Sequence, residues 1–239
     1  MHPIVIIGSG LAGFTVLREL RKRDQATPVT LITSDDGHFY SKPNLSNALA
    51  AGKSADQLVS MTAEKMAADQ NATILTHTRV TAIDPVGKKV RLENGEISYR
   101  KLVLALGADP IPHGLTGSGV EKIYAVNDLQ DYAVFRAALK PGHRVAILGG
   151  GLIGSEFAND LAIAGYSVDV VHLGPWPLER LIPEQVGQSL ANALRDKGVR
   201  WHFGRTAKNI AQKNGAVEIT LDDGSTVEAD RKQIAALAA

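Results

Sequence analysis

The 239-residue chain contains no cysteine and carries a formal net charge of only +1. The lack of cysteine excludes disulfides, thiolate nucleophiles and cysteine-based zinc or iron–sulfur sites within this sequence. The near-neutral charge provides no broad field that would attract nucleic acid or an anionic membrane. No apolar run reaches the roughly 18 residues of a membrane-spanning helix, and the N-terminus lacks the basic stretch of a signal peptide. We therefore expect a cytoplasmic protein without a nucleic-acid partner and without insertion into a membrane.

Signatures of metal sites and of common hydrolases are missing as well. The seven histidines show no spacing typical of a metal site, so we expect no bound metal. The sequence has no G-x-S-x-G nucleophile elbow and no Walker A loop. These absences leave the glycine-rich loops as the main functional signal.

Two copies of the dinucleotide-binding motif G-x-G-x-x-G are present, at residues 8–13 and 149–154. Each copy follows an apolar run and opens a helical pattern. In this motif one glycine turns the chain, one lets the backbone approach a pyrophosphate, and one lets the helix pack on the strand. The N-terminus of the helix then presents free N–H groups to the phosphates. The expected contact residues are Gly8, Ser9, Gly10, Leu11, Ala12 and Gly13 in the first copy, and Gly149, Gly151, Leu152, Ile153 and Gly154 in the second.

The pattern around each motif is a strand, a glycine loop, a helix and a second strand, which is the order of a βαβ crossover. Since the pattern occurs twice, the expected fold class is α/β, with two Rossmann-like, parallel-sheet dinucleotide-binding domains and β-hairpin insertions. Residues 108–120 are rich in proline and glycine, so we place the boundary between domains 1–112 and 113–239 there. The crossovers are expected at 3–7, 12–22 and 29–32, and at 144–148, 152–164 and 167–172.

The remaining elements follow from shorter patterns. Alternating residues around a turn predict one β-hairpin at 80–84 and 88–93 and another at 216–221 and 225–229. The face of the first helix that carries Arg18, Arg21, Lys22 and Arg23 is expected to face solvent. The alanine-rich end of the chain is interpreted as a short helix. Further helices are expected at 44–51, 62–69, 129–139 and 185–196, and further strands at 102–105 and 199–203.

These motifs together resemble the FAD- and NAD(P)H-dependent pyridine-nucleotide:disulfide oxidoreductase-like family, which are flavin reductases with two dinucleotide sites. The resemblance runs from residue 1 to about residue 230 and stops where the family continues into a C-terminal part, so the sequence resembles a shortened member. It implies that the first glycine loop holds FAD and the second holds the nicotinamide cofactor. The segments that carry it are 4–13, 40–46, 76–84, 101–107, 149–161 and 175–178.

The resemblance implies that Lys42 and Glu156 are the catalytic residues. Lys42, followed by Pro43, matches a family lysine beside the flavin ring, where a cation would stabilise the reduced ring and the proline would fix the backbone. Glu156 matches a glutamate at the junction of flavin and nicotinamide, and we expect it to pair with Lys42 across the two domains. The alternatives are an exposed loop lysine and an acid that complements the helix N-terminus.

Other cofactor contacts are implied around the two loops. Val80 matches a position whose backbone contacts the adenine of FAD, although it also fits a hairpin core. Ala105 and Gly107 match a turn that passes close to FAD, where Leu106 replaces the family threonine. Thr33 and Ser34 match the ribose-binding strand end of the first site, and we assign Asp35 and Asp36 to the following turn. In the second site that position is His172, with Arg180 nearby, and we favour NADH over NADPH.

The implied reaction is hydride transfer from NADH to FAD, which makes the chain an FAD-dependent NAD(P)H oxidoreductase. Without a cysteine, electrons would leave the flavin directly for a small iron protein such as rubredoxin. The resemblance implies that this electron transfer serves alkane hydroxylation in bacteria. We expect a monomer. Two alternatives remain: an inactive dinucleotide-binding protein, and an oxidase that reduces oxygen or a small quinone.

Overall fold

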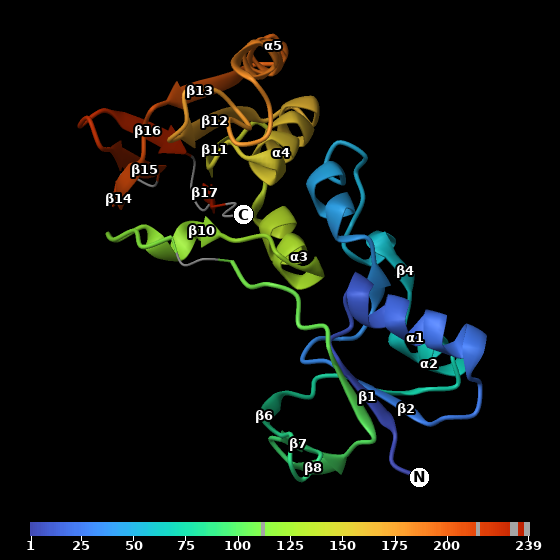
Figure 1. Cartoon of the computed structure of the whole chain (residues 1–239). Coiled ribbons are helices and arrows are strands. Elements are labelled where there is room, and N and C mark those ends of the chain that lie inside the picture. Colours follow the sequence, from blue (N-terminus) through green and yellow to red (C-terminus); the bar gives the residue numbers. More distant parts are fainter. Residues whose placement is uncertain (111–112, 214–215, 230–233, 237–239) are drawn as a thin grey trace. The chain divides into compact units, whose positions relative to one another are not determined.

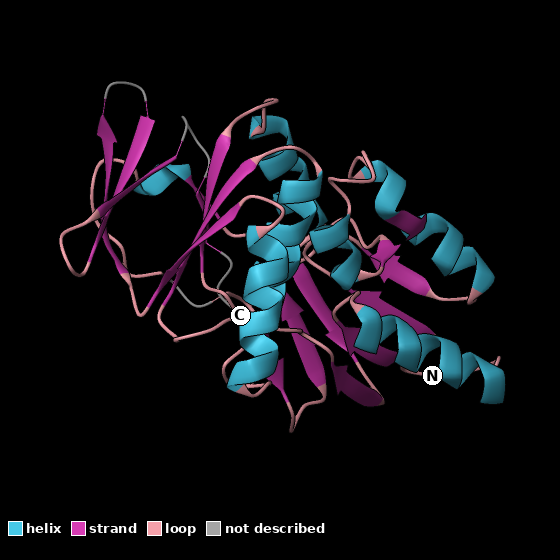
Figure 2. Ribbon diagram, turned by 90° about the horizontal axis from the view of Figure 1, so that it is seen from above, coloured by secondary structure: helices cyan, strands magenta, loops and turns pink. Residues whose placement is uncertain are grey.

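The computed structural model describes residues 1–110, 113–213, 216–229 and 234–236. Its contacts divide the chain into two compact units: unit 1 comprises Met1–Ser41 and Asp56–Ala108, and unit 2 comprises Lys42–Ala55 and Asp109–Ala239. Figure 1 labels the helices and most of the strands, and Figure 2 colours them by type. The division by cofactor at residue 112 stays a prediction, while residues 42–55 pack with unit 2.

Unit 1 is built on a four-stranded parallel sheet with the order β5-β2-β1-β9. Ile4 of β1 lies opposite Val29 of β2 and Lys101 of β9. A separate three-stranded antiparallel sheet contains β6, β7 and β8, and β3 pairs with β4. The bounds are β1 Ile4–Ile7, α1 Leu11–Arg23, β2 Val29–Ile32, β3 Phe39–Tyr40, η2 Asp56–Leu58, β4 Val59–Met61, α2 Ala63–Asp69, β5 Thr73–Leu75, β6 Val80–Asp84, β7 Lys89–Leu92, β8 Gly95–Ser98 and β9 Lys101–Leu104.

The first strand, β1, is apolar at every position because both of its faces are covered. Ile4 and Ile6 belong to a buried cluster with Phe14 and Leu17 of α1. Val5 and Ile7 point to the other face and pack with residues of the antiparallel sheet, such as Val90 of β7. Alternate residues of a strand point to opposite faces, so a strand between two layers needs an unbroken apolar run. This arrangement fixes the end of β1, where the first glycine loop begins.

One helical arginine expected on a solvent-facing surface is instead buried. The exposed fraction of Arg21 is only 8%. Its guanidinium donates hydrogen bonds to the carbonyl oxygens of Gln70 (2.5 Å), Asn71 (2.8 Å), Thr27 (2.9 Å) and Asp24 (3.0 Å). The prediction that Arg21 faces solvent is therefore wrong, because two turns of the chain use this side chain to satisfy their carbonyl groups.

Replacement of Arg21 by methionine is expected to lower the free energy of unfolding by about 3 kcal/mol, because four carbonyl groups lose a charged donor. A shift of the guanidinium denaturation midpoint, followed by circular dichroism, measures the effect. Arg23→Met removes the same charge from an exposed position of the same helix. It is expected to change stability by no more than about 0.5 kcal/mol. Equal midpoints for the two variants would contradict the structural role of Arg21.

Unit 2 repeats this construction with a five-stranded parallel sheet of order β10-β17-β11-β12-β13. A three-stranded antiparallel sheet contains β14, β15 and β16. The bounds are η1 Lys42–Asn47, η3 Val120–Lys122, β10 Ile123–Tyr124, α3 Leu129–Ala138, β11 Arg144–Leu148, α4 Leu152–Ile163, β12 Ser167–His172, α5 Glu184–Arg195, β13 Val199–Phe203, β14 Ala207–Lys213, β15 Ala216–Leu221, β16 Thr226–Ala229 and β17 Ile234–Ala236.

The strand before the second glycine loop, β11, is also covered on both faces. Val145 and Ile147 pack in a cluster with Phe157 of α4. Ala146, between them, belongs to a second cluster with Ile210 of β14 and other residues of the antiparallel sheet. The predicted fold class, with Rossmann-like parallel sheets and antiparallel hairpin insertions, is therefore confirmed.

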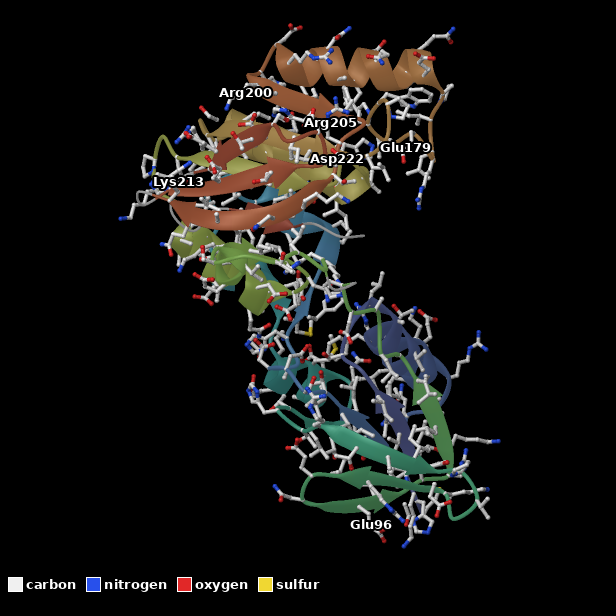
Figure 3. The ribbon with its side chains drawn as sticks, turned by 90° about the vertical axis from the view of Figure 1, so that its left-hand side faces the viewer. Glu96, Glu179, Arg200, Arg205, Lys213 and Asp222 are labelled. Carbon is white, nitrogen blue, oxygen red and sulfur yellow. The ribbon has the colours of Figure 1, made fainter. Side chains whose placement is uncertain are left out.

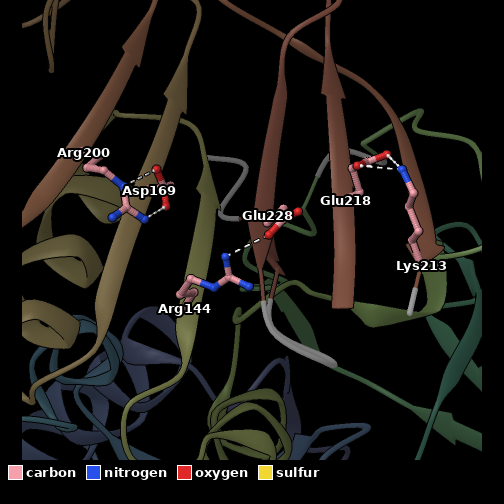
Figure 4. A network of polar contacts seen from close by, with 6 residues as sticks. All are labelled: Arg144, Asp169, Arg200, Lys213, Glu218 and Glu228. Atoms are coloured by element: carbon pink, nitrogen blue, oxygen red, sulfur yellow. Dashed lines mark hydrogen bonds and ion pairs between the residues drawn. The ribbon is translucent and has the colours of Figure 1, made fainter. Parts of the chain in front are cut away.

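A polar network crosses the sheet strands of unit 2 (Figure 4). Arg200 of β13 donates two hydrogen bonds to Asp169 of β12, at 2.9 Å from Nε and 2.5 Å from a terminal nitrogen. His202 also contacts this carboxylate at 2.8 Å. Burial of Asp169 raises its pKa, but the hydrogen bonds and charges of His202 and Arg200 outweigh burial, so the pKa lies below its ordinary value. The ionised Asp169 therefore links β12 to β13, three residues before His172 at the end of β12.

Two sequence-based predictions of helices are wrong. The predicted helix at 44–51 is a short 3₁₀ helix, η1, followed by turns. The N–H groups of Leu49 and Ala50 donate to the carboxylate of Asp160 at 2.8 and 3.0 Å, so they do not continue a helix. Of the alanine-rich end that was interpreted as a short helix, residues 234–236 belong to β17, which hydrogen-bonds between β10 and β11, and residues 237–239 lie outside the described residues. There the pairing with two neighbours overrides the helix propensity of alanine.

Several strands, among them β5, β8, β10 and β14, were not anticipated from the sequence. None of these four strands shows a clear alternation of apolar and polar residues. Each is recognised as a strand because it hydrogen-bonds to a neighbouring strand. The other predicted helices and strands are present within a few residues of their expected bounds.

Candidate functional site

The two glycine loops have nearly the same backbone geometry. Gly8 and Gly149 both have a φ of 109°, a value that side chains disfavour. A Cβ atom on Gly13 would lie 1.9 Å from the carbonyl oxygen of Gly8, and one on Gly154 would lie 2.0 Å from that of Gly149. These glycines let the helix approach the strand, as the motif predicts.

The middle glycines of the two loops face open space. A Cβ atom added to Gly10 or Gly151 would meet no protein atom within 4 Å. Both residues are N-caps, of α1 and α4, and neither helix has a side-chain cap or an acidic residue in its first turn. The first N–H groups of each helix therefore lack a protein acceptor and can bind an anion. Both loops fit the pyrophosphate of a dinucleotide.

A cluster of polar side chains lies beside the first loop. The hydroxyl oxygens of Ser9 and Thr33 lie 2.9 Å apart. Both hydroxyls donate to Asp35, at 3.0 Å and 2.6 Å, and the N–H of Gly37 donates to the same oxygen at 2.9 Å. Asp35 therefore connects the glycine loop with the end of β2. The sequence pattern predicts only a turn at Asp35, because the contact with Ser9 spans 26 residues and leaves no local signal.

The other expected contacts of the first site are distributed over unit 1. Ser34 is exposed beside Thr33. Val80 pairs with Leu92 in the antiparallel sheet and packs on a core cluster, so it has the hairpin role that we considered as an alternative. The carbonyl oxygen of Ala105 lies against Gly8, and Gly107 is exposed with a φ of 73°. The structure therefore brings Ala105 directly to the glycine loop. The backbone contact of Val80 with the adenine of FAD stays a prediction, since the hairpin role is compatible with it.

The end of β12 carries His172 directly under the second loop. Its exposed fraction is 8%, and its Nδ1 accepts a hydrogen bond from the N–H of Gly150 at 3.1 Å. Arg180, expected nearby, is 90% exposed. His172 therefore supports the loop from below, and its ring is not directed freely toward solvent.

Unit 2 contains a mostly apolar pocket of about 340 Å³ that includes both expected catalytic residues. The pocket lies at the start of α4, which supplies Leu152, Ile153 and Glu156. The segment η1 supplies Lys42 and Pro43. The other lining residues are Leu45, Ser46, Pro110, Ala125, Val126, Asn127 and Phe157. An apolar cavity with a few polar groups at its wall is typical of a site for a small organic ligand.

Lys42 and Glu156 each bond to another residue of this pocket. The Lys42 ammonium donates to Oδ1 of Asn127 at 2.7 Å. The hydroxyl of Ser46 donates to Oε2 of Glu156 at 2.5 Å. Both residues belong to unit 2. A pair between them would therefore form within this unit, whereas the expected pair was one that crosses between the two domains. Ser46 and Asn127 were missed as polar partners by sequence analysis.

Asp160 holds the segment that carries Lys42 in place. Its side chain, in a residue only 3% exposed, accepts the N–H groups of Leu49 and Ala50. Burial raises the pKa of this carboxyl, whereas the two N–H groups act in the opposite direction. The contacts span 110 and 111 residues, so α4 positions both Glu156 and the segment around Lys42.

Two other kinds of site are absent from the described parts of the chain. No group of three or more histidine, aspartate or glutamate side chains is arranged to hold a metal ion among those residues. None of the helices in the same residues has both the length and the apolarity needed to cross a membrane.

Comparison with known sequences gives one family over almost the whole chain. The family model described as pyridine nucleotide-disulphide oxidoreductase matches residues 2–236. A rubredoxin-NAD(+) reductase of Alcanivorax borkumensis is 47% identical over 231 residues, covering 96% of this chain and 60% of the relative. A nitric oxide reductase FlRd-NAD(+) reductase of Aeromonas hydrophila is 39% identical over 230 residues, covering 96% and 59%. The chain thus spans about 60% of the length of the curated relatives that it matches.

Solved structures share the fold of the chain. The covalent putidaredoxin reductase–putidaredoxin complex contains a chain with a TM-score of 0.89 and 29% identity, and the match covers 99% of this chain and 58% of that one. A water-forming NADH oxidase from Lactobacillus brevis has a TM-score of 0.90 with 20% identity, covering 100% and 54%. At that identity the second match supports the fold alone.

Proposed function

Because the chain belongs to the pyridine nucleotide-disulphide oxidoreductase family, we propose that it passes electrons from NADH through FAD to a small iron protein such as rubredoxin. The observation that carries this proposal is the pair of glycine loops with open middle glycines and uncapped helices. FAD is assigned to the loop at Gly10 and NADH to the loop at Gly151. A chain with two dinucleotide cradles is suited to electron exchange between two coenzymes.

The pocket of unit 2 supplies the residues for the redox step. FAD, when bound, would supply the hydride and electron-transfer chemistry, and the residues of this pocket would orient its ring and stabilise its charge. Lys42 would provide a positive charge that stabilises negative charge on the reduced ring. Ser46 would hold Glu156 in a fixed orientation. A ring bound against the apolar wall of the pocket would displace water from it, which would strengthen the effect of these charges.

The acceptor and the cellular setting are inferred from the names of relatives. Two curated relatives, from Alcanivorax borkumensis and Acinetobacter baylyi, are named rubredoxin-NAD(+) reductase, at 47% and 42% identity. We therefore favour rubredoxin as the acceptor, with alkane hydroxylation as the process served and the cytoplasm as the location. The absence of cysteine from this sequence supports direct transfer from the flavin, since no disulfide of these residues can relay electrons.

An absorption experiment tests the proposal. The purified chain, incubated with FAD and freed of excess, is expected to be yellow and to be bleached by anaerobic addition of NADH. Addition of rubredoxin and cytochrome c should then give cytochrome reduction well above the control without rubredoxin. A colourless chain that binds NADH would contradict the proposal and favour an inactive dinucleotide-binding protein. Bleaching without any rubredoxin dependence would favour an oxidase or quinone reductase.

A further inference from the structure

The end of β12 lacks the acidic residue that usually binds the ribose hydroxyls of the adenosine half of NADH. His172 is at this position, and both of its ring nitrogens already have protein partners. Nδ1 accepts from the N–H of Gly150 at 3.1 Å. Since a backbone N–H can only donate, the ring proton lies on Nε2. His172 therefore has no free nitrogen with which to bind a ribose.

The proton on Nε2 points to a carboxylate that lies seven residues further along the chain. Nε2 of His172 lies 2.8 Å from Oε2 of Glu179 and 3.1 Å from the carbonyl oxygen of Trp176. The side chain of Glu179 is 27% exposed. Its other oxygen, Oε1, lies 3.8 Å from the exposed Arg180. His172 thus fixes one carboxylate oxygen of Glu179, while the side chain as a whole stays 27% exposed.

The segment that carries Glu179 is fixed to the second glycine loop. The N–H of Leu178 donates to the carbonyl oxygen of Gly150 at 3.0 Å. The indole N–H of Trp176 donates to the carbonyl oxygen of Ile182 at 3.2 Å. The N–H of Gly150 therefore bonds to His172, and its carbonyl oxygen bonds to the segment that carries Glu179. Figure 3 shows Glu179 on the loop that follows β12.

We propose that Glu179, positioned by His172, is the residue that binds the adenine-ribose hydroxyls of NADH and excludes NADPH. A carboxylate can accept hydrogen bonds from the 2′- and 3′-hydroxyls of a ribose, as the usual acid at the strand end does. It repels a 2′-phosphate, because it is unfavourable to bring like charges together. The inference rests on the assignment of the nicotinamide cofactor to this loop.

Nucleotide binding without any flavin tests this inference. The two tryptophans of the chain report on the site, since Trp176 contacts His172 and Trp201 lies against Gly150. Quenching of their fluorescence is titrated with NADH and, separately, with NADPH. The wild-type chain is expected to bind NADH about tenfold or more tightly than NADPH. In Glu179→Gln, which keeps the shape but loses the charge, this preference should fall by about tenfold.

Glu184→Gln is the matched control, because it removes the same charge from an exposed position five residues away. Its preference should stay within about twofold of the wild-type value, since distant exposed charges are screened. Equal preference in wild type and Glu179→Gln, with both nucleotides still bound, would overturn the inference and leave the proposed function intact. Failure of the wild-type chain to bind either nucleotide would overturn the proposed function itself, and the inference with it.

Discussion

Valine in place of Gly10 is expected to abolish FAD binding without loss of NADH binding, and valine in place of Gly151 is expected to do the opposite. Each substitution should weaken its own dinucleotide by at least about 100-fold, or about 2.7 kcal/mol, because a side chain would occupy the place of the pyrophosphate. Flavin content is measured from the visible absorption of the purified chain. NADH binding is measured from the quenching of tryptophan fluorescence.

Each substitution is expected to affect only its own nucleotide because the backbone at Gly10 and Gly151 can accommodate a side chain. Gly10 and Gly151 have φ values of −68° and −72°, which any residue adopts. No protein atom lies within 4 Å of an added Cβ atom at either position. The fold should therefore accept valine at a cost of about 1 kcal/mol for a poorer N-cap. Only a bound phosphate would meet the new side chain.

Each of these variants is the control for the other, and Gly13→Val provides a third comparison. A Cβ atom there would lie 1.9 Å from the carbonyl oxygen of Gly8, so this variant should lose structure and flavin together. A Gly10→Val chain that retains FAD with unchanged affinity would show that the first loop does not hold the pyrophosphate. Loss of both nucleotides in both variants would point instead to a general effect on folding.

The glycine loops could be predicted from the sequence because their signals are local. The apolar runs of β1 and β11 are covered on both faces, so every residue of the run is apolar. The glycines that follow are required by backbone contacts within a few residues of the chain, or with the strand next to it. Strand, loop and helix therefore agree with one another at each level.

Contacts between distant segments account for the features that the sequence did not predict. The helical position of Arg21 suggested a solvated face, and only the turn at Gln70 and Asn71, 49 and 50 residues away, buries it. The helix expected at 44–51 is replaced by a shorter one because Asp160 takes up two of its N–H groups. No local pattern contains such information.

The candidate site shows the same division between local and distant information. The resemblance selected Lys42 and Glu156, and the structure places both at one pocket. Their partners Asn127 and Ser46 carry no motif and became visible only through hydrogen bonds. His172 was expected to contact the ribose itself, whereas its ring nitrogens are bonded to Gly150 and to Glu179.

Lys42→Met is expected to slow the reduction of bound FAD by NADH about 100-fold, which is the size of effect found when one charged or polar stabiliser is removed from an active site. Methionine has nearly the length of lysine but no charge, so the pocket keeps its shape. The negative charge of the reduced ring would then lack a nearby cation in a mostly apolar cavity. The rate is measured by anaerobic stopped-flow absorption, and the reduction potential of the flavin should become more negative.

Lys53→Met separates this role from a general effect of charge. Lys53 is an exposed lysine of the same segment, Lys42–Ala55, and does not line the pocket. Its replacement should leave the reduction rate within about twofold, because exposed charges at a distance are screened by salt. Equal rates in the two variants would remove Lys42 from the redox step. Its hydrogen bond to Asn127 would then be a structural contact that holds η1 against the turn before α3.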